Sequence, residues 1–312
     1  MKKFNIAAID IGGTFTKMAI LTNDGTFLEN KKIKTPHLLP PEKMIKNIAG
    51  RIKELGKGLS FNTCIIGIPG LINSKEGKVI KASNLKGWEN IELKTILQKE
   101  TKAQIIIEND ANLIALGEMG FGAAKNFKNF ILLAIGTGLG GGIILDGKLY
   151  RGVSGYAGEF GHFNIKRNGF KCSCGKYGCL ETYVSSIGVN NLYNKYSKKF
   201  SSFKVAKNEK GNINPADLFN AYKKGNTLAI KIFNEMGRTL GSFISGIANS
   251  LDVETFVLTG GVSNSYEAFI NPLLNEVKKR TFPEISQNLS ILKGTLGDKA
   301  ALLGGLLLLK QQ

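Results

Sequence analysis

The sequence of 312 residues lacks an apolar run long enough to cross a membrane. Its most apolar stretches are Phe130–Leu145, which contains five glycines, and Ala300–Leu309, which has only ten residues. A membrane-spanning helix needs about 20 apolar residues. A signal peptide is also excluded, because Asp10 and Gly12 interrupt the apolar residues that follow the N-terminal lysines. We therefore expect a cytoplasmic protein with no membrane partner.

Cysteine and histidine are scarce, with four and two residues respectively. Cys64 lies in an apolar run and is expected to be a buried thiol. The other three cysteines fall within the eight residues 172–179. In a cytosolic chain, such clustering indicates a metal site before a disulfide.

Acidic residues are also few. The sequence has 24 Asp and Glu residues and 42 Lys and Arg residues, which gives a net charge of +18. This balance can indicate a nucleic-acid partner. The lysines are spread along the chain, however, and only 195–210 is dense in them. We therefore expect a solvated basic surface that attracts an anionic substrate such as a nucleotide, and no nucleic-acid binding.

What the chain does contain is enough apolar sequence, 43%, for a sizeable core in about two domains. The strand, glycine turn, strand and Asp-Gly turn of residues 4–25 recur at 130–147, which suggests an internal duplication. We predict strands over 4–11, 16–21, 28–34, 63–68, 104–107, 130–135, 142–145 and 255–258. We predict helices over 42–57, 91–100 and 111–119, within 185–250, and over 298–309.

Three glycine-rich turns follow apolar strands, at Asp10–Thr14, Gly136–Gly142 and Thr259–Gly261. Glycines let backbone N–H groups approach an anion closely, and the Asp of the first turn could hold Mg²⁺ through water. A single turn of this kind is more often a hairpin, but three favour phosphate binding. The G-x-G-x-x-G match within the second turn should open a helix, and residues 142–147 instead predict a strand and turn, so a Rossmann site is excluded.

An acidic segment, Glu108–Asn112, lies between a predicted strand and a predicted helix. Asp110 could simply be the N-cap of that helix. The same position can also hold a general base, because a nearby helix N-terminus favours the ionised carboxylate. A sugar hydroxyl that attacks a γ-phosphoryl group needs such a proton acceptor.

A metal site is predicted from His162, Cys172, Cys174 and Cys179, which are ligands that tetrahedral Zn²⁺ prefers. Free thiols or a disulfide are the alternative. Four protein ligands leave no open position, so the zinc would be structural. It would also fix the nearby carboxylates of Glu159 and Glu181 in one loop region.

With these motifs the chain resembles the ROK family of sugar kinases, within the actin/hexokinase-like ATPase superfamily. The resemblance implies an α/β fold of two duplicated actin/hexokinase-like (ribonuclease H-like) domains, with a cleft for ATP and sugar. One domain would comprise residues 1–118 plus the C-terminal helix 298–312. The other would comprise 119–297 with a zinc loop at 159–181. The motifs that match the family are Asp10–Thr14, Glu108–Asn112, Gly136–Gly142, Gly158–His162, 172–175 and 178–181.

The resemblance also implies individual roles. Asp110 would be the general base for the sugar 6-hydroxyl. Sugar hydroxyls would be bound by Asn84, Asn109, Glu159, His162 and Glu181, with His162 also bound to Zn²⁺. ATP and Mg²⁺ would be held by Asp10, Gly12, Gly13, Thr14, Lys17, Gly136, Thr137, Gly138, Gly260 and Gly261. Phe15 departs from the family pattern, because many relatives carry Lys or Asn at this position.

We therefore expect an ATP-dependent hexose 6-kinase, with glucokinase favoured over kinases of N-acetylmannosamine, fructose, allose or a β-glucoside. The family also contains sugar-responsive repressors with a helix-turn-helix segment before the first phosphate loop. Only nine residues precede Asp10, which disfavours a repressor. A non-catalytic sugar-binding module is disfavoured by Asp110 and the three glycine turns. The resemblance implies a homodimer or homotetramer.

Overall fold

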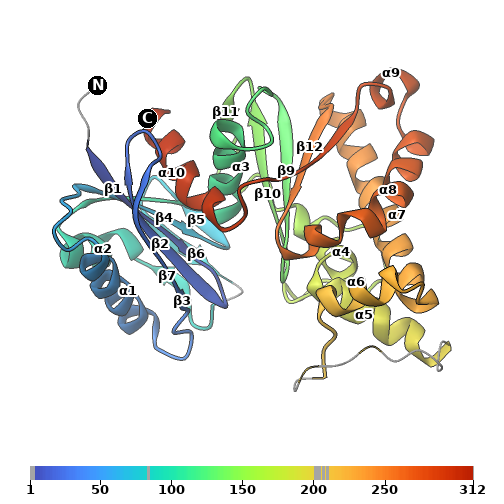
Figure 1. Ribbon diagram of the computed structural model, residues 1–312, viewed down its shortest axis with the longest axis horizontal. Coiled ribbons are helices and arrows are strands. Elements are labelled where there is room, and N and C mark those ends of the chain that lie inside the picture. The colour runs from blue at the N-terminus through green and yellow to red at the C-terminus, as the bar shows by residue number, and fades with distance from the viewer. Residues whose placement is uncertain (1–3, 83–84, 200–204, 206–207, 209–210, 312) are drawn as a thin grey trace. The chain divides into compact units, whose positions relative to one another are not determined.

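The computed structural model describes residues 4–82, 85–199, 205, 208 and 211–311. The chain forms two compact units. Unit 1 comprises residues 1–128, 142–158 and 296–312, and unit 2 comprises 129–141 and 159–295. Figure 1 shows the helices and strands, whose alternation confirms the predicted α/β class. Among the described residues, no helix is both long and apolar enough to span a bilayer.

Unit 1 is built on a five-stranded sheet of order β3-β2-β1-β4-β8. The first three strands in sequence pair antiparallel, whereas β1, β4 and β8 pair parallel. The predicted strands are confirmed within a few residues of their observed ends. The observed bounds are β1 (Asn5–Ile11), β2 (Phe15–Thr22), β3 (Phe27–Lys34), β4 (Thr63–Ile68) and β8 (Gln104–Asn109).

The two faces of this sheet are covered by different helices. Ala7, Ile9 and Ile11 of β1 share a buried cluster with apolar residues of helix α1 (Pro41–Leu55), because alternate residues of a strand face the same side. Helix α2 (Leu93–Thr101) adds Leu93 and Leu97 to this cluster. A small sheet of order β5-β6-β7 also contributes, with bounds Leu71–Asn73, Lys78–Lys81 and Glu89–Ile91; these three strands were not predicted.

Helices α3 (Asp110–Phe121) and α10 (Ala300–Lys310) also belong to unit 1 and pack closely against each other. Eight of the eleven residues of α10 are buried, as expected for a helix enclosed by other elements. Glycines allow the close approach, because a Cβ on Gly304 would lie 1.8 Å from the Leu113 carbonyl oxygen. The short helix η4 (Gly297–Lys299) precedes α10.

The second five-stranded sheet has the order β11-β10-β9-β12-β13. The border between the units passes through β10, between Gly141 and Gly142. The predicted Asp-Gly turn joins β10 to β11, and both turn residues have positive φ, as a type I′ hairpin turn requires. The strand bounds are β9 (Phe130–Ile135), β10 (Leu139–Leu145), β11 (Lys148–Leu149), β12 (Thr255–Thr259) and β13 (Ser290–Lys293).

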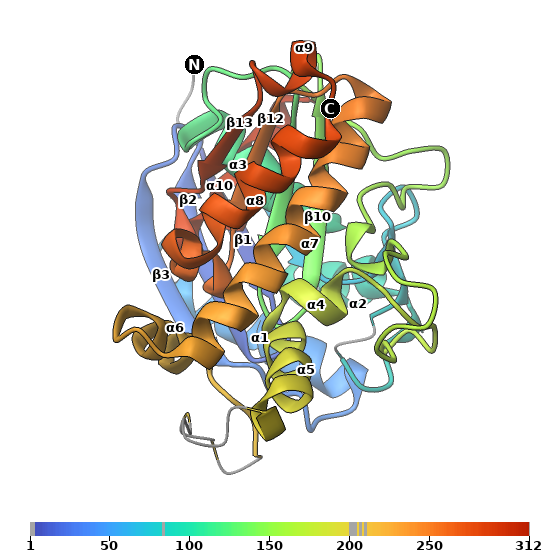
Figure 2. The same cartoon turned by 90° about the vertical axis from the view of Figure 1, so that its right-hand side faces the viewer.

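Helices supply most of unit 2, which confirms the helical prediction for 185–250. The long helix α7 (Thr227–Leu251) lies alongside α8 (Tyr266–Arg280) (Figure 2). Shorter helices complete the unit. They are η1 (Phe160–His162), α4 (Glu181–Val184), α5 (Ser186–Tyr196), η2 (Ser197–Lys199), α6 (Pro215–Lys223), η3 (Gly261–Ser265) and α9 (Pro283–Ser286).

The division into units differs from the predicted domain bounds in the middle of the chain. Residues 119–128 and 142–158 belong to unit 1, although the prediction placed them in the second domain. Two observations give the physical reason. Helix α3 continues to Phe121, past the predicted boundary, and the 147–149 hairpin is hydrogen-bonded to Gln311.

Candidate active site and metal centre

In unit 1, two predicted site segments, Asp10–Thr14 and Glu108–Asn112, meet at one edge of the sheet. Strands β1, β4 and β8 run parallel, and Asp10, Gly67 and Glu108 are aligned across them. A Cβ built on Gly67 would lie 3.7 Å from Asp10 Oδ1 and 3.6 Å from the Cα of Asp110. The structure therefore brings Asp10 and Asp110 together on either side of Gly67. Carboxyl ends of parallel strands are common ligand-binding positions in α/β proteins.

The first glycine turn connects β1 to β2 as a tight hairpin. The Gly12 N–H donates to the Phe15 carbonyl oxygen at 3.0 Å, and the Thr35 hydroxyl donates to the Gly12 carbonyl oxygen at 2.6 Å. Thr14 is exposed at the tip. Phe15 is also exposed, with the Lys32 ammonium 4.8 Å from its ring centroid. The turn thus has hairpin geometry, and phosphate binding by Gly12, Gly13 and Thr14 stays a prediction.

Lys17 lies beside this turn, between two carboxylates. Its Nζ is 2.9 Å from Asp10 Oδ2 and 3.3 Å from Asp298 Oδ1. Burial lowers the pKa of Lys17, but the two carboxylates outweigh burial and the net pKa shift is upward. The ammonium therefore stays charged and neutralises the buried Asp10 carboxylate. Sequence reasoning missed Asp298, because its contact with Lys17 joins distant parts of the chain.

Asn109 and Asp110 form the junction between β8 and α3. Asn109 is the N-cap, and its Oδ1 accepts hydrogen bonds from the N–H groups of Ala111 and Asn112 at 2.9 and 3.2 Å. Its Nδ2 donates to the Gly70 carbonyl oxygen at 3.1 Å. Asp110 is instead the first residue of the helix, where the helix dipole stabilises a carboxylate. This geometry disfavours the simple N-cap interpretation of Asp110.

Glu108, directly before these residues, is buried, and both of its carboxylate oxygens accept hydrogen bonds. Its Oε2 accepts a hydrogen bond from Arg151 Nε at 2.7 Å. Its Oε1 accepts from the Asn109 N–H and from Asn112 Nδ2, both at 2.9 Å. Sequence analysis placed Glu108 in the motif but gave it no role, and it did not identify Arg151.

In unit 2, the second and third glycine turns follow neighbouring parallel strands. Thr259 of β12 is aligned with Ala134 of β9, so both turns begin at the same sheet edge. Gly260 has φ +90°, and a Cβ there would lie 2.5 Å from the Ile135 carbonyl oxygen. Only glycine fits this position without strain.

The second turn is also packed against the segments that follow it. The Gly136 carbonyl oxygen accepts from the Ser186 N–H at 3.0 Å, at the start of α5. A Cβ on Gly138 would lie 2.6 Å from Glu181 Oε2. The structure therefore brings Gly136 and Gly138 together with Glu181, a predicted sugar ligand.

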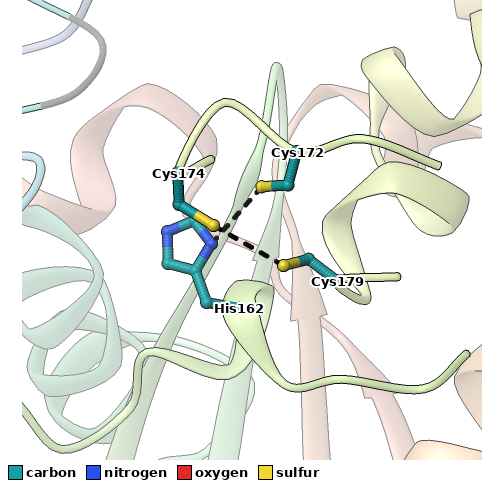
Figure 3. A group of neighbouring side chains, drawn as sticks. All are labelled: His162, Cys172, Cys174 and Cys179. Carbon is teal, nitrogen blue, oxygen red and sulfur yellow. Dashed lines mark hydrogen bonds between the residues drawn. The ribbon is translucent and has the colours of Figure 1, made fainter. Parts of the chain in front are cut away.

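His162, Cys172, Cys174 and Cys179 converge, and their ligand atoms all lie within 4.8 Å of one another (Figure 3). Cys172 Sγ is 3.6 Å from His162 Nδ1, and Cys174 Sγ is 3.7 Å from Cys179 Sγ. Tetrahedral zinc, with Zn–S near 2.3 Å and Zn–N near 2.0–2.1 Å, requires S···S of about 3.8 Å and S···N of about 3.6 Å. The donor set and its spacing fit Zn²⁺.

A carboxylate lies near each of the two ring nitrogens of His162. Nδ1, which faces the cysteines, is 4.0 Å from Glu181 Oε1, and Nε2 is 4.0 Å from Glu159 Oε2. Burial raises the pKa of Glu159. Burial and the hydrogen bond to Glu181 raise the pKa of the Cys172 thiol, so a thiolate there needs a neighbouring cation. The three predicted sugar ligands of unit 2, Glu159, His162 and Glu181, therefore adjoin one metal centre.

The predicted site residues thus form one group in each unit. Unit 1 gathers Asp10, Lys17, Asn109 and Asp110 at a sheet edge, and unit 2 places its second glycine turn beside Glu181, with the third turn at the same edge of its own sheet. Asn84 lies outside the described residues, as do 200–204, 206–207 and 209–210 of the lysine-rich stretch. Burial raises the pKa of Cys64 to about 12, which confirms the expected buried thiol.

Comparison with known proteins identifies relatives over most of the chain. A family model described as the ROK family matches residues 6–312. The glucokinase of Halalkalibacterium halodurans is 35% identical over 97% of this chain and 94% of its own length. The xylose repressor of Bacillus spizizenii is 35% identical over 84% of this chain and 64% of its own length. A ROK glucokinase from Streptomyces griseus, solved with glucose and AMPPNP, is 29% identical, covers 99% of this chain and 100% of its own, and has a TM-score of 0.83.

Proposed function

The chain belongs to the ROK family, and from this we propose that it is an ATP-dependent hexose 6-kinase that favours glucose. The family and the structural likeness confirm the predicted actin/hexokinase-like fold. One observation carries the proposal: Asp110 begins α3 at the sheet edge that also holds Asp10. The relatives support the substrates, since the glucokinase from Streptomyces griseus was solved with glucose and an ATP analogue.

In the proposed reaction, Asp110 accepts the proton of the sugar 6-hydroxyl as that oxygen attacks the γ-phosphoryl group of ATP. Its place at the start of α3 favours the ionised form that accepts a proton. Asn109, fixed by its bonds to Gly70 and to the first turn of α3, is proposed to bind a sugar hydroxyl through its remaining amide hydrogen.

The glycine turns are the proposed nucleotide contacts of each unit, through backbone groups of Gly12 and its neighbours in unit 1 and of Gly136, Gly260 and their neighbours in unit 2. Asp10 is the carboxylate proposed to hold Mg²⁺ through water. The Lys17 ammonium, 2.9 Å from Asp10 Oδ2, neutralises its charge. When bound, Mg²⁺ would neutralise charge on the phosphate oxygens. Oxygen donors such as the Asp10 carboxylate suit this ion.

Zinc is proposed as a structural ion on His162, Cys172, Cys174 and Cys179. With His162 Nδ1 turned to the cysteines, Nε2 is the ring nitrogen left for a sugar hydroxyl. Metal binding to Nδ1 would fix both the tautomer and the orientation of the ring. The ion would thus hold His162 in place beside the proposed sugar ligands Glu159 and Glu181 without entering the reaction.

A second candidate function is sugar-responsive regulation, because a relative with 35% identity is a xylose repressor. A regulator binds sugar without turning over ATP, so turnover separates the two functions.

The test is a coupled ADP-release assay with Mg-ATP on glucose, mannose, fructose, allose, N-acetylglucosamine, N-acetylmannosamine and a β-glucoside, with Asp110→Asn as the inactive control. Preference for glucose, with loss of turnover in Asp110→Asn, is the expected result. Preference for an N-acetyl sugar would keep the reaction and replace the substrate. Sugar binding without turnover of any hexose would favour the regulator.

A further inference from the structure

We infer that Arg151 is a positioning residue that acts through Glu108 to hold the segment carrying the general base. This inference rests on the proposed function, because it concerns the orientation of Asp110. Arg151 belongs to none of the motifs that matched the family, and it lies 43 residues from Glu108 in the sequence. Its role is therefore visible only in the structure.

The contact is a half-buried ion pair, in which the carboxylate is buried and the Arg151 side chain is 37% exposed. Arg151 Nε lies 2.7 Å from Glu108 Oε2, and the Glu108 side chain is 2% exposed. Within the described part of the chain, Glu108 forms an ion pair with Arg151 alone. A buried carboxylate that loses its counter-ion must take up a proton or move toward water. The position of Glu108 therefore depends on Arg151.

The second oxygen of the same carboxylate holds the residues on both sides of Asp110. Glu108 Oε1 accepts hydrogen bonds from the Asn109 N–H at 2.9 Å and from Asn112 Nδ2 at 2.9 Å, with the Ser74 hydroxyl at 3.4 Å. The carboxylate thus connects the guanidinium to the end of β8 and the first turn of α3. A shift of Glu108 would displace Asp110, which lies between the two bonded asparagines.

Arg151 is itself held in a closed loop. Its carbonyl oxygen accepts a hydrogen bond from the Ala157 N–H at 3.0 Å. Gly152, Gly155 and Gly158 turn this loop with positive φ values of 72°, 87° and 94°. The chain then leads directly to Glu159 and His162. The anchor of the base segment therefore lies in the loop that also delivers two proposed sugar ligands.

The experiment compares Arg151→Met, Arg151→Lys, Glu108→Gln and the double variant Arg151→Met/Glu108→Gln with the wild type. The matched control is Arg51→Met, the same change at an exposed position of α1 in the same unit. We expect Arg151→Met to lower kcat by about 10- to 100-fold, with KM for ATP changed less than about twofold, because small displacements of a catalytic group cost about this much rate. Arg151→Lys keeps a cation and should recover at least about tenfold of that loss.

The double variant tests whether Arg151 acts through Glu108. In Glu108→Gln, an amide N–H₂ faces the guanidinium, and two donors oppose each other. Removing the guanidinium relieves this conflict, while the Gln oxygen can still accept from Asn109 and Asn112. We therefore expect the double variant to be no slower than Glu108→Gln. Multiplicative losses in the double variant, or a kcat of Arg151→Met within about twofold of Arg51→Met, would overturn the inference.

Hydrogen exchange separates this inference from the proposed function. Amide exchange of residues 109–112 should become faster in Arg151→Met than in Arg51→Met, whether or not any hexose is phosphorylated. Equal exchange in the two variants would refute the positioning role. Absence of hexose turnover in the wild type, with faster exchange in Arg151→Met, would refute only the proposed function.

Discussion

Substituting Gly304 by alanine should destabilise unit 1, because α10 approaches α3 too closely for a side chain. A Cβ on Gly304 would lie 1.8 Å from the Leu113 carbonyl oxygen, and a Cβ on Gly117 would lie 2.1 Å from the Ala300 carbonyl oxygen. Real Cβ contacts essentially never fall below 3.0 Å. The two helices would have to separate by at least about 1.2 Å at Leu113, and backbone atoms cannot rotate away as a flexible side chain can.

The size of the effect follows from two opposing contributions. Overpacking in a close-packed core costs about 1–3 kcal/mol, and α10 is buried along most of its length, so we expect the upper end. Alanine gains about 0.8–1.0 kcal/mol over glycine as a helix former. The net loss of unfolding free energy should be about 2 kcal/mol, which lowers Tm by about 4–8 °C in a domain of this size. Urea denaturation followed by circular dichroism measures it.

Gly50→Ala provides the control for this prediction. Gly50 is an exposed residue within α1, and no atom lies within 4 Å of the position that a Cβ would take there. The same substitution should therefore raise stability by about 0.5–1 kcal/mol. Equal stability changes in Gly304→Ala and Gly50→Ala would refute the packing argument. A further consequence is a lower kcat in Gly304→Ala, since Leu113 lies one helical turn from Asp110.

The remaining predictions concern the site. Asp110→Asn should lower kcat for the hexose by at least about 10²-fold, the low end for a general base, while calorimetry shows unchanged sugar affinity; near-normal turnover would refute the assignment. Purified protein should contain one zinc ion per chain. Cys174→Ser or removal of zinc by a chelator should raise KM for the sugar, because zinc would no longer hold His162 in place. An unchanged KM for the sugar in zinc-free protein would contradict this prediction. The hydrogen bond from Lys32 and the charge of Lys17 hold the pKa of Asp298 below its usual value, so its stabilising contribution is present at neutral pH and is lost as pH falls through that lowered pKa. The stability difference between wild type and Asp298→Asn should therefore shrink from about pH 7 to about pH 3 in urea titrations, and a constant difference would count against the ion pair.

Elements with a long apolar pattern could be predicted from the sequence. Strands β1, β4 and β9 consist mostly of apolar residues, and α1 shows helical spacing of its buried residues. The strands β5 to β7 have only three or four residues each, so cross-strand pairing stabilises them more than their own pattern does. Helix α8 was not predicted and contains Pro272, which normally interrupts a helical pattern.

The start of β10 shows a different limit. The prediction began this strand at residue 142, because glycines dominate the preceding residues, but the strand begins at Leu139. Glycine lowers strand propensity, yet pairing within the sheet decides the outcome here. The Gly136–Gly142 motif therefore divides into a short turn and the first half of a strand, which still excludes the Rossmann geometry.

The site was predictable where its residues are close in sequence. Three of the four candidate metal ligands lie within residues 172–179, so their spacing alone indicated the cluster. Asn109 and Asp110 could be predicted for the same reason, because they are neighbours within one motif. The Lys17–Asp298 and Glu108–Arg151 pairs join residues far apart in the chain, and a single sequence does not indicate which of its 42 cations meets which carboxylate.

These two ion pairs place a cation beside each of two buried carboxylates at one sheet edge. Asp10 lies against the Lys17 ammonium at 2.9 Å, which neutralises its charge. Asp110 begins a helix whose dipole favours its ionised form, and the adjacent negative charge of Glu108 is neutralised by Arg151. Asp10 and Glu108, the buried acids beside the proposed base, therefore each have a cation of their own, and Asp110 is the proposed proton acceptor because of its place at the start of α3.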